Sequence, residues 1–173
     1  MKVRLVTTLI FIALAVGLLA PAGIVSANGA KHVYATASSV SLCFGVDTPH
    51  PDCHFATPTP LPNGRLEIRG MVNVMQFTSS DPRWNALCIF TADPFTIADN
   101  KTNPLMGSFV CTPNDAALQG WWEGSVTEVF QADGNVIARF TAKGYGAFDR
   151  MTTISWNSMS AHGPLDIEII ELP

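Results

Sequence analysis

The sequence predicts an all-β protein, most simply an antiparallel eight-stranded barrel, with a β-sandwich as the alternative. Eight runs are rich in strand-forming residues, several with apolar side chains at every second position, and turn-forming residues separate them. No run shows the apolar stripe of an amphipathic helix. A closed barrel removes exposed strand edges, and Gly70, Gly144 and Gly146 lie inside or beside the runs, where a barrel needs bends.

The first residues of the chain have the pattern of a secretory signal peptide. Lys2 and Arg4 precede an apolar run that ends at Pro21, and the small residues of Val25–Ala27 suit a cleavage site. We therefore expect a signal peptide at 1–27 and a single secreted, or extracytoplasmic, β-barrel domain at 28–173. A retained membrane anchor is the alternative, because the apolar run approaches the roughly 18 residues that span a bilayer.

The charge of the chain limits the classes of partner. It has 10 basic and 14 acidic residues, and cleavage after Ala27 would remove two of the basic ones. An acidic surface without a basic cluster argues against nucleic acid and anionic membranes as partners. The partners that remain are a small-molecule ligand or an extracellular protein or glycan. The sequence predicts no cofactor and leaves the oligomeric state open.

The strands follow one another along most of the chain. We expect them at 31–43, 65–80, 84–91, 105–112, 120–131, 135–143, 147–157 and 164–172. In the second of these, Leu66, Ile68, Val72 and Val74 share one face. A Pro-rich connector at 57–64 separates the first two strands and is poorly suited to join a sheet.

The four cysteines predict two disulfides, as is usual for an even number in an exported chain. If 84–91 and 105–112 form an antiparallel hairpin in which Cys88 faces Cys111, then Phe90 faces Phe109 and Ala92 faces Gly107. This register places the two phenylalanines opposite each other and therefore favours a Cys88–Cys111 bond. Cys43 is then left to pair with Cys53.

A second hairpin is indicated by Asp133-Gly134, a strong signal for a type I′ turn. A two-residue loop there would place Phe130 opposite Ile137 and Glu128 opposite Arg139, which matches apolar with apolar and acid with base.

The stretch Cys43–Phe55 concentrates residues that could bind a metal. Reduced Cys43 and Cys53 with His50 and His54 could supply four ligands, but export favours oxidation of the two thiols. We therefore interpret the stretch as a disulfide-closed loop. A metal site formed by His50, His54 and an aspartate, and a reactive thiol, are the alternatives.

Several short motifs carry a resemblance to a known group of proteins. These are GRLEIRG at 64–70, SDPRW at 80–84, GWWEGS at 120–125 and KGYGAFDRM at 143–151. The pattern resembles small, exported, functionally uncharacterised bacterial proteins with G-x-L-x-I-R-G, D-P-R, W-x-G and G-x-G motifs. More distantly, the strand-rich C-terminal part resembles the eight-stranded barrel of the allene oxide cyclase and dirigent type. The resemblance implies a fold and supplies no catalytic residue.

The candidate ligand-binding residues are Glu67, Arg69, Trp84 and Trp122. Glu67 and Arg69 share a strand face, and would form an internal ion pair if that face points into the barrel or a solvated pair if it points outward. The tryptophans could line an apolar or sugar-binding surface, or pack in the core.

Two further patterns can be decided by alternation along a strand. Trp121 and Trp122 must face opposite sides of their strand. Glu123 and Glu128, five residues apart, also face opposite sides, so they cannot be the paired carboxylates of a glycosidase.

These observations favour a binding or interaction module over an enzyme. We expect a disulfide-stabilised barrel that takes a small apolar or amphipathic ligand or presents a surface to an extracellular partner. A cyclase- or isomerase-type enzyme that uses Glu67 and Arg69 inside the barrel is one alternative, and metal binding through His50 and His54 is another. The motifs of lipases, zinc proteases, P-loop enzymes and dinucleotide-binding enzymes are absent from the sequence.

Overall fold

The computed structural model describes residues 29–44, 46–97, 104–130, 136–155, 158–159 and 164–173. The predicted signal peptide at 1–27 lies outside these residues. Within them, no helix has both the length and the apolar character needed to cross a membrane.

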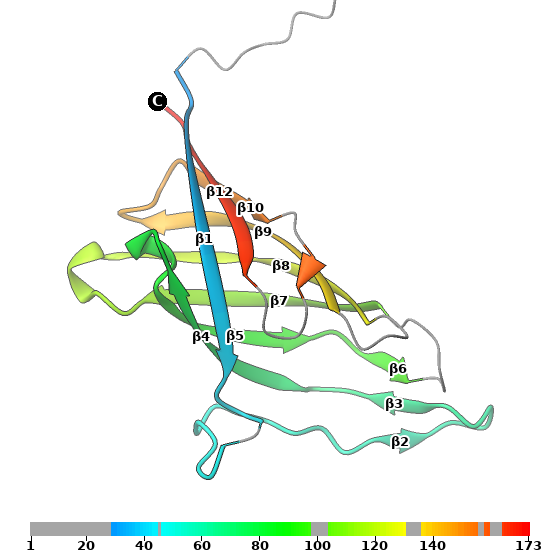
Figure 1. The fold of residues 1–173 in the computed structure, drawn as a ribbon. Coiled ribbons are helices and arrows are strands. Elements are labelled where there is room, and N and C mark those ends of the chain that lie inside the picture. The colour runs from blue at the N-terminus through cyan, green and yellow to red at the C-terminus, as the bar shows by residue number, and fades with distance from the viewer. Residues whose placement is uncertain (1–28, 45, 98–103, 131–135, 156–157, 160–163) are drawn as a thin grey trace, which may run out of the picture. The chain divides into compact units, whose positions relative to one another are not determined.

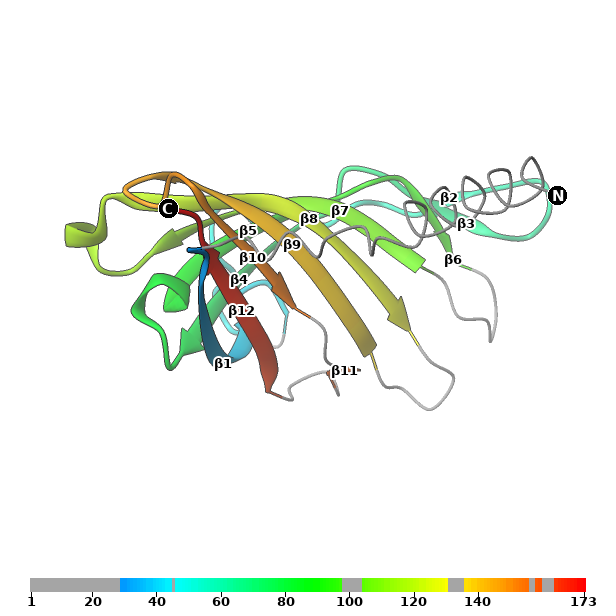
Figure 2. The same cartoon turned by 90° about the horizontal axis from the view of Figure 1, so that it is seen from above.

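Eight antiparallel strands close into the predicted barrel (Figure 1, Figure 2). Around the barrel they follow the order β1, β4, β5, β7, β8, β9, β10 and β12, and pairing of β12 with β1 closes the ring. Their bounds are β1 Lys31–Ser41, β4 Val72–Ser79, β5 Ala86–Ala92, β7 Pro104–Pro113, β8 Gly120–Phe130, β9 Val136–Gly146, β10 Met151–Ser155 and β12 Leu165–Glu171.

Four shorter strands and two 3₁₀ helices complete the secondary structure of the described residues. β11 (Ser158–Met159) pairs with β9, and the other three strands form a second sheet in the order β2 (Thr59–Pro60), β3 (Leu66–Ile68) and β6 (Phe95–Ile97). We call this second sheet the extension. The 3₁₀ helices are η1 (Pro82–Trp84) and η2 (Ala116–Leu118).

The predicted strand 65–80 is in fact two strands, β3 in the extension and β4 in the barrel. The chain breaks at Gly70, whose φ of +69° lies in the left-handed region that glycine adopts most easily. Leu66 and Ile68 therefore do not share a barrel face with Val72 and Val74, and that prediction is wrong. The register nevertheless continues across the break, because Leu66 pairs with Ile97 in the extension just as Val72 pairs with Thr91 in the barrel.

Both predicted disulfides are present. Cys88 lies opposite Cys111, Phe90 opposite Phe109 and Ala92 opposite Gly107, so the predicted register is confirmed. Cys43 bonds to Cys53 and closes the predicted loop. This loop lies over the outer face of β4, where the Val74 N–H donates to Cys43 Sγ at 3.1 Å, and Val74 is fully buried.

Removing the Cys88–Cys111 bond is expected to lower the free energy of unfolding by about 2–4 kcal/mol, because the bond restricts the unfolded chain. Urea unfolding of a Cys88→Ala/Cys111→Ala variant measures this loss. The matched control, Cys43→Ala/Cys53→Ala, opens a sequence separation of 10 residues rather than 23, and chain entropy alone predicts a loss smaller by roughly 0.7 kcal/mol. An unchanged midpoint in the first variant would contradict the prediction.

The predicted register of the hairpin between β8 and β9 is wrong by one residue. Val129, not Phe130, lies opposite Ile137, and Glu128 lies opposite Ala138 instead of Arg139. A slip of one residue moves side chains between the two faces of a strand pair, so Glu128 points into the barrel while Arg139 is exposed. The Asp133-Gly134 turn itself lies outside the described residues.

An aromatic cluster fills one end of the barrel. Trp84, carried by η1, stacks on Trp122 with 5.6 Å between ring centroids and 13° between their planes. Phe77, Phe109, Phe140 and Phe148 surround the pair. Gly144 makes room for this packing, since a Cβ there would lie 2.2 Å from the carbonyl oxygen of Phe148. We call this the plugged end.

Candidate functional site

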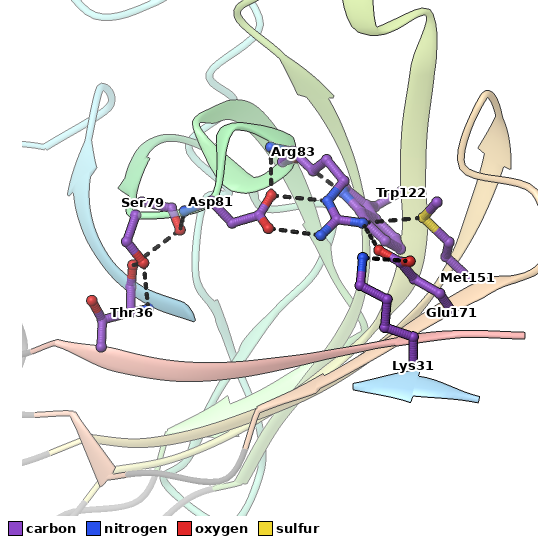
Figure 3. A network of polar contacts seen from close by, with 9 residues as sticks. Lys31, Thr36, Ser79, Asp81, Arg83, Trp122, Met151 and Glu171 are labelled. Atoms are coloured by element: carbon purple, nitrogen blue, oxygen red, sulfur yellow. Dashed lines mark hydrogen bonds and ion pairs between the residues drawn. The ribbon is translucent and has the colours of Figure 1, made fainter. Parts of the chain in front are cut away.

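A network of charged side chains centred on Arg83 lies at the plugged end (Figure 3). The Arg83 guanidinium donates to Asp81 through Nε at 2.9 Å and Nη2 at 2.7 Å, and to Glu171 through Nη1 at 2.5 Å. Lys31 Nζ donates to the other carboxylate oxygen of Glu171, Oε2, at 3.1 Å. The side chains of Asp81 and Arg83 are 10% and 15% exposed, so the pair is largely removed from water.

This network explains the Asp-Pro-Arg motif as a structural element. Asp81 caps η1 by accepting the Arg83 backbone N–H at 2.9 Å, Pro82 begins the helix, and Arg83 reaches back across the barrel end to Glu171. Burial would raise the pKa of Asp81, but the hydrogen bonds and charge of Arg83 outweigh it and lower this pKa overall. Hydrogen bonds from Arg83 and Lys31 lower the pKa of Glu171. The Arg83 guanidinium is already paired with two carboxylates. It therefore stabilises this end of the barrel and is not available to bind an anionic ligand.

The four predicted ligand-binding residues do not come together. Trp84 and Trp122 are buried in the aromatic cluster, with exposed fractions of 1% and 0%, and the Trp122 indole N–H donates to the Arg83 carbonyl at 3.0 Å. Glu67 and Arg69 lie at β3, away from this cluster, and form a bidentate ion pair with two bonds of 2.8 Å. An acid–base pair formed by Glu67 and Arg69 inside the barrel is therefore wrong, because the extension places both outside it.

The histidines of the disulfide loop already have partners. His50 Nδ1 accepts the Asp52 N–H at 3.3 Å, and His54 Nδ1 lies 2.6 Å from the Gly70 carbonyl oxygen. Both cysteines of the loop are oxidised, which removes the thiolate ligands and the reactive thiol. Across the described ranges, no group of three or more His, Cys, Asp or Glu residues is placed to hold a metal.

The alternation predicted for Trp121 and Trp122 is confirmed. Trp122 is buried, whereas Trp121 is 37% exposed on the outer wall and stacks on Tyr145 at 5.6 Å. Its indole N–H donates to Glu123 at 2.8 Å. Trp156, the remaining tryptophan that could have joined an aromatic binding surface, lies outside the described residues.

A small cavity lies inside the other end of the barrel. Glu128 is six residues beyond Trp122 along β8, a separation of roughly 20 Å along the strand. Phe90 of the cavity lining contacts Phe77 and Phe109, so the cavity borders the aromatic cluster. The cavity has a volume of about 30 Å³. Most of its lining is apolar, and the side chains that matter here are Asn73, Met75, Phe90, Leu105, Val126 and Glu128.

Glu128 is the functional candidate that the sequence predictions missed. Burial in this lining raises the pKa of its carboxyl group. No hydrogen bond or ion pair satisfies the carboxylate within the part of the chain that the structure describes. The inward direction of Glu128 could have been read from the sequence of β8. Trp122, Val126 and Glu128 are separated by even numbers of residues, so their side chains lie on one face of the strand.

A second, larger concavity of about 320 Å³ lies where the extension meets β7. Its lining combines two carboxylates with apolar residues: Glu67, Asp93, Pro94, Phe95, Thr96, Pro104 and Met106.

Comparisons with protein-family models, with curated proteins and with solved structures found no match for this chain. The resemblance to exported bacterial proteins thus stays a prediction, and the function is inferred from the geometry of the barrel.

Proposed function

We propose that this protein is an exported binding module whose barrel takes one end of a small amphipathic ligand at the Glu128 cavity. A single observation carries the proposal: the Glu128 carboxylate, which has no partner among the described residues, faces a cavity inside the barrel among apolar side chains. Burying a charge without a partner is costly, so such a group is retained most readily where a ligand completes it. The signal-peptide pattern and the two disulfides support an oxidising, extracytoplasmic setting.

The size and chemistry of the cavity define the end of the ligand that enters. A volume of about 30 Å³ holds one or two groups the size of water. An ionised carboxylate only accepts hydrogen bonds, so the group that enters must donate them. A primary amine with its first methylene satisfies both conditions, since this methylene can lie against Met75, Phe90 or Leu105 while the rest of the alkyl chain stays outside the cavity.

Binding is favoured over catalysis because, of the residues that the structure describes, Glu128 is the one titratable side chain in the cavity lining. A cyclase or isomerase would need a second group to move a proton or stabilise charge. Glu67 and Arg69 were expected to supply that chemistry. Glu67 instead lines the larger concavity beside the extension, and Arg69 lines neither cavity.

The test is a titration of the purified exported protein with n-octylamine, followed by NMR. We expect Glu128→Gln to weaken n-octylamine binding roughly tenfold to a hundredfold, because a hydrogen bond to a charged group is lost. Glu123→Gln is the matched control, since it removes the same charge from the opposite face of β8 and should leave binding unchanged. Equal affinity of wild type and Glu128→Gln would overturn the proposal. Native mass spectrometry of the protein as purified would identify a ligand that is already bound.

A further inference from the structure

An exposed aromatic pair lies on the outer wall of the barrel at the plugged end. Trp121 of β8 is opposite Tyr145 of β9, and Trp121 keeps 37% of its surface exposed although the two rings stack. The turns beside the pair, 114–119 and 147–150, belong to the described residues. β8 and β9 are joined to each other at their opposite ends, roughly 30 Å along the strands from Trp121. Described residues therefore border the pair in both strands and both turns.

Two opposite charges lie beside the rings without pairing with each other. Glu123 and Lys143 are directly opposite across β8 and β9, a position in which opposite charges attract. No ion pair joins these two described side chains. The Glu123 carboxylate instead accepts the Trp121 indole N–H at 2.8 Å. The Lys143 ammonium lies 5.3 Å from the centre of the Tyr145 ring. Each charge is therefore held by one of the rings, and the two charges stay side by side.

Hydroxyl groups continue this face along the same two strands. Ser125 and Thr141 are both exposed, and their hydroxyl oxygens lie 3.4 Å apart. Along the outer wall the order is thus an aromatic pair, an acid beside a base, and two hydroxyl groups.

This combination favours a neutral ligand that carries several hydroxyl groups and an apolar face. A carboxylate only accepts hydrogen bonds and an ammonium only donates them, whereas a hydroxyl group does both. Two adjacent hydroxyls of one ligand can therefore bond to Glu123 and Lys143 at once. Glu123 repels an anion, and Lys143 repels a cation. A pyranose ring meets these conditions, and its C–H groups can pack on Trp121.

We propose that this face of β8 and β9 binds a neutral pyranose unit of an extracellular glycan. Trp121 contacts the apolar side of the sugar, and Glu123 and Lys143 bind two of its adjacent hydroxyls. A protein partner fits less well, because charged residues are depleted from the core of protein interfaces and here two charges border the exposed ring. The inference is independent of the Glu128 cavity, since Glu123 and Glu128 lie on opposite faces of β8.

The probes are three neutral trisaccharides, cellotriose, maltotriose and chitotriose, titrated into the full exported protein. We expect at least one of them to bind and to shift the NMR signal of the Trp121 indole N–H. Sorbitol has comparable hydroxyl groups but no ring to pack on the indole, so it should bind roughly tenfold more weakly. Equal affinity for sorbitol, or no binding of any of the three trisaccharides at millimolar concentration, would overturn the proposal.

Three variants separate the contributions of the ring and of the charges. Trp121→Ala removes the packing surface and should weaken trisaccharide binding roughly tenfold. Glu123→Gln and Lys143→Gln each remove a hydrogen bond to a charged group and should also weaken it roughly tenfold. Asp47→Asn, which removes an exposed carboxylate from the disulfide loop, is the control and should leave binding unchanged.

The result with the charge variants is decisive because glutamine at either position leaves the ring in place. Unchanged affinity in both Glu123→Gln and Lys143→Gln would contradict the proposed contacts with the hydroxyls. If the free protein instead forms a dimer in analytical ultracentrifugation that Trp121→Ala dissociates, the occupant of this face is a second copy and the proposal fails.

Discussion

Replacing Trp84 with alanine is expected to lower the free energy of unfolding by about 3–5 kcal/mol, the range for loss of a large buried aromatic side chain. Trp84 is 1% exposed and contacts four other aromatic rings, those of Phe77, Phe109, Trp122 and Phe140. The rigid closed wall of the barrel limits how far these rings can collapse into the space left behind.

The conservative variant Trp84→Phe distinguishes packing from hydrogen bonding. The Trp84 indole N–H is buried and lacks a hydrogen-bond partner in the described part of the chain. Phenylalanine removes this unsatisfied donor and keeps a ring in the cluster, so we expect it to lose less than half as much stability as alanine. Urea unfolding followed by circular dichroism measures both variants. A loss below about 1 kcal/mol for Trp84→Ala would show that the cluster is not close-packed.

Replacing Arg83 with methionine is expected to cost about 3–5 kcal/mol, because it leaves two partly buried carboxylates without their common partner. Ionised carboxylates only accept hydrogen bonds, and Lys31 forms a direct ion pair with Glu171 but only a longer-range attraction with Asp81. Methionine preserves much of the side-chain volume, so the loss reports the charge. Arg65→Met is the control, since Arg65 is exposed and its side chain has no partner among the described residues.

The pH dependence of this loss identifies its origin. Arg83 lowers the pKa of Asp81 and Glu171 from ordinary values of 3.8 and 4.5. A carboxyl group whose pKa is lowered by folding contributes stability above its ordinary pKa, and that stability is lost as the pH falls through the lowered value. The difference between wild type and Arg83→Met should therefore be full at pH 7 and shrink in acid. A difference that does not change with pH would assign the loss to packing.

The sequence was sufficient for features that depend on local alternation and pairing. The Cys88–Cys111 bond followed from a register in which Phe90 meets Phe109, because a buried disulfide and a buried aromatic pair both constrain the same hairpin. The barrel followed from the number and spacing of the strands.

Features decided by tertiary structure were not predictable in the same way. Gly70 could be a bend within one strand or a break between two sheets, and only the pairing of β3 with β6 decides between them. That choice moved Glu67 and Arg69 out of the barrel. Asp133-Gly134 indicated a turn but did not fix its length, so the register of Glu128 was missed by one residue. The inward direction of Glu128 was readable from Trp122 and Val126 alone.

The pairing of Lys31 with Glu171 has a practical consequence for binding experiments. It brings the start of β1 and the end of β12 together at the plugged end, whereas Glu128 lies toward the opposite end of β8. A protein immobilised on a sensor surface through a tag after Pro173 is held by the end that the Arg83 network stabilises. Attachment at that end leaves the end of β8 that carries Glu128 as the part of the barrel farther from the tether.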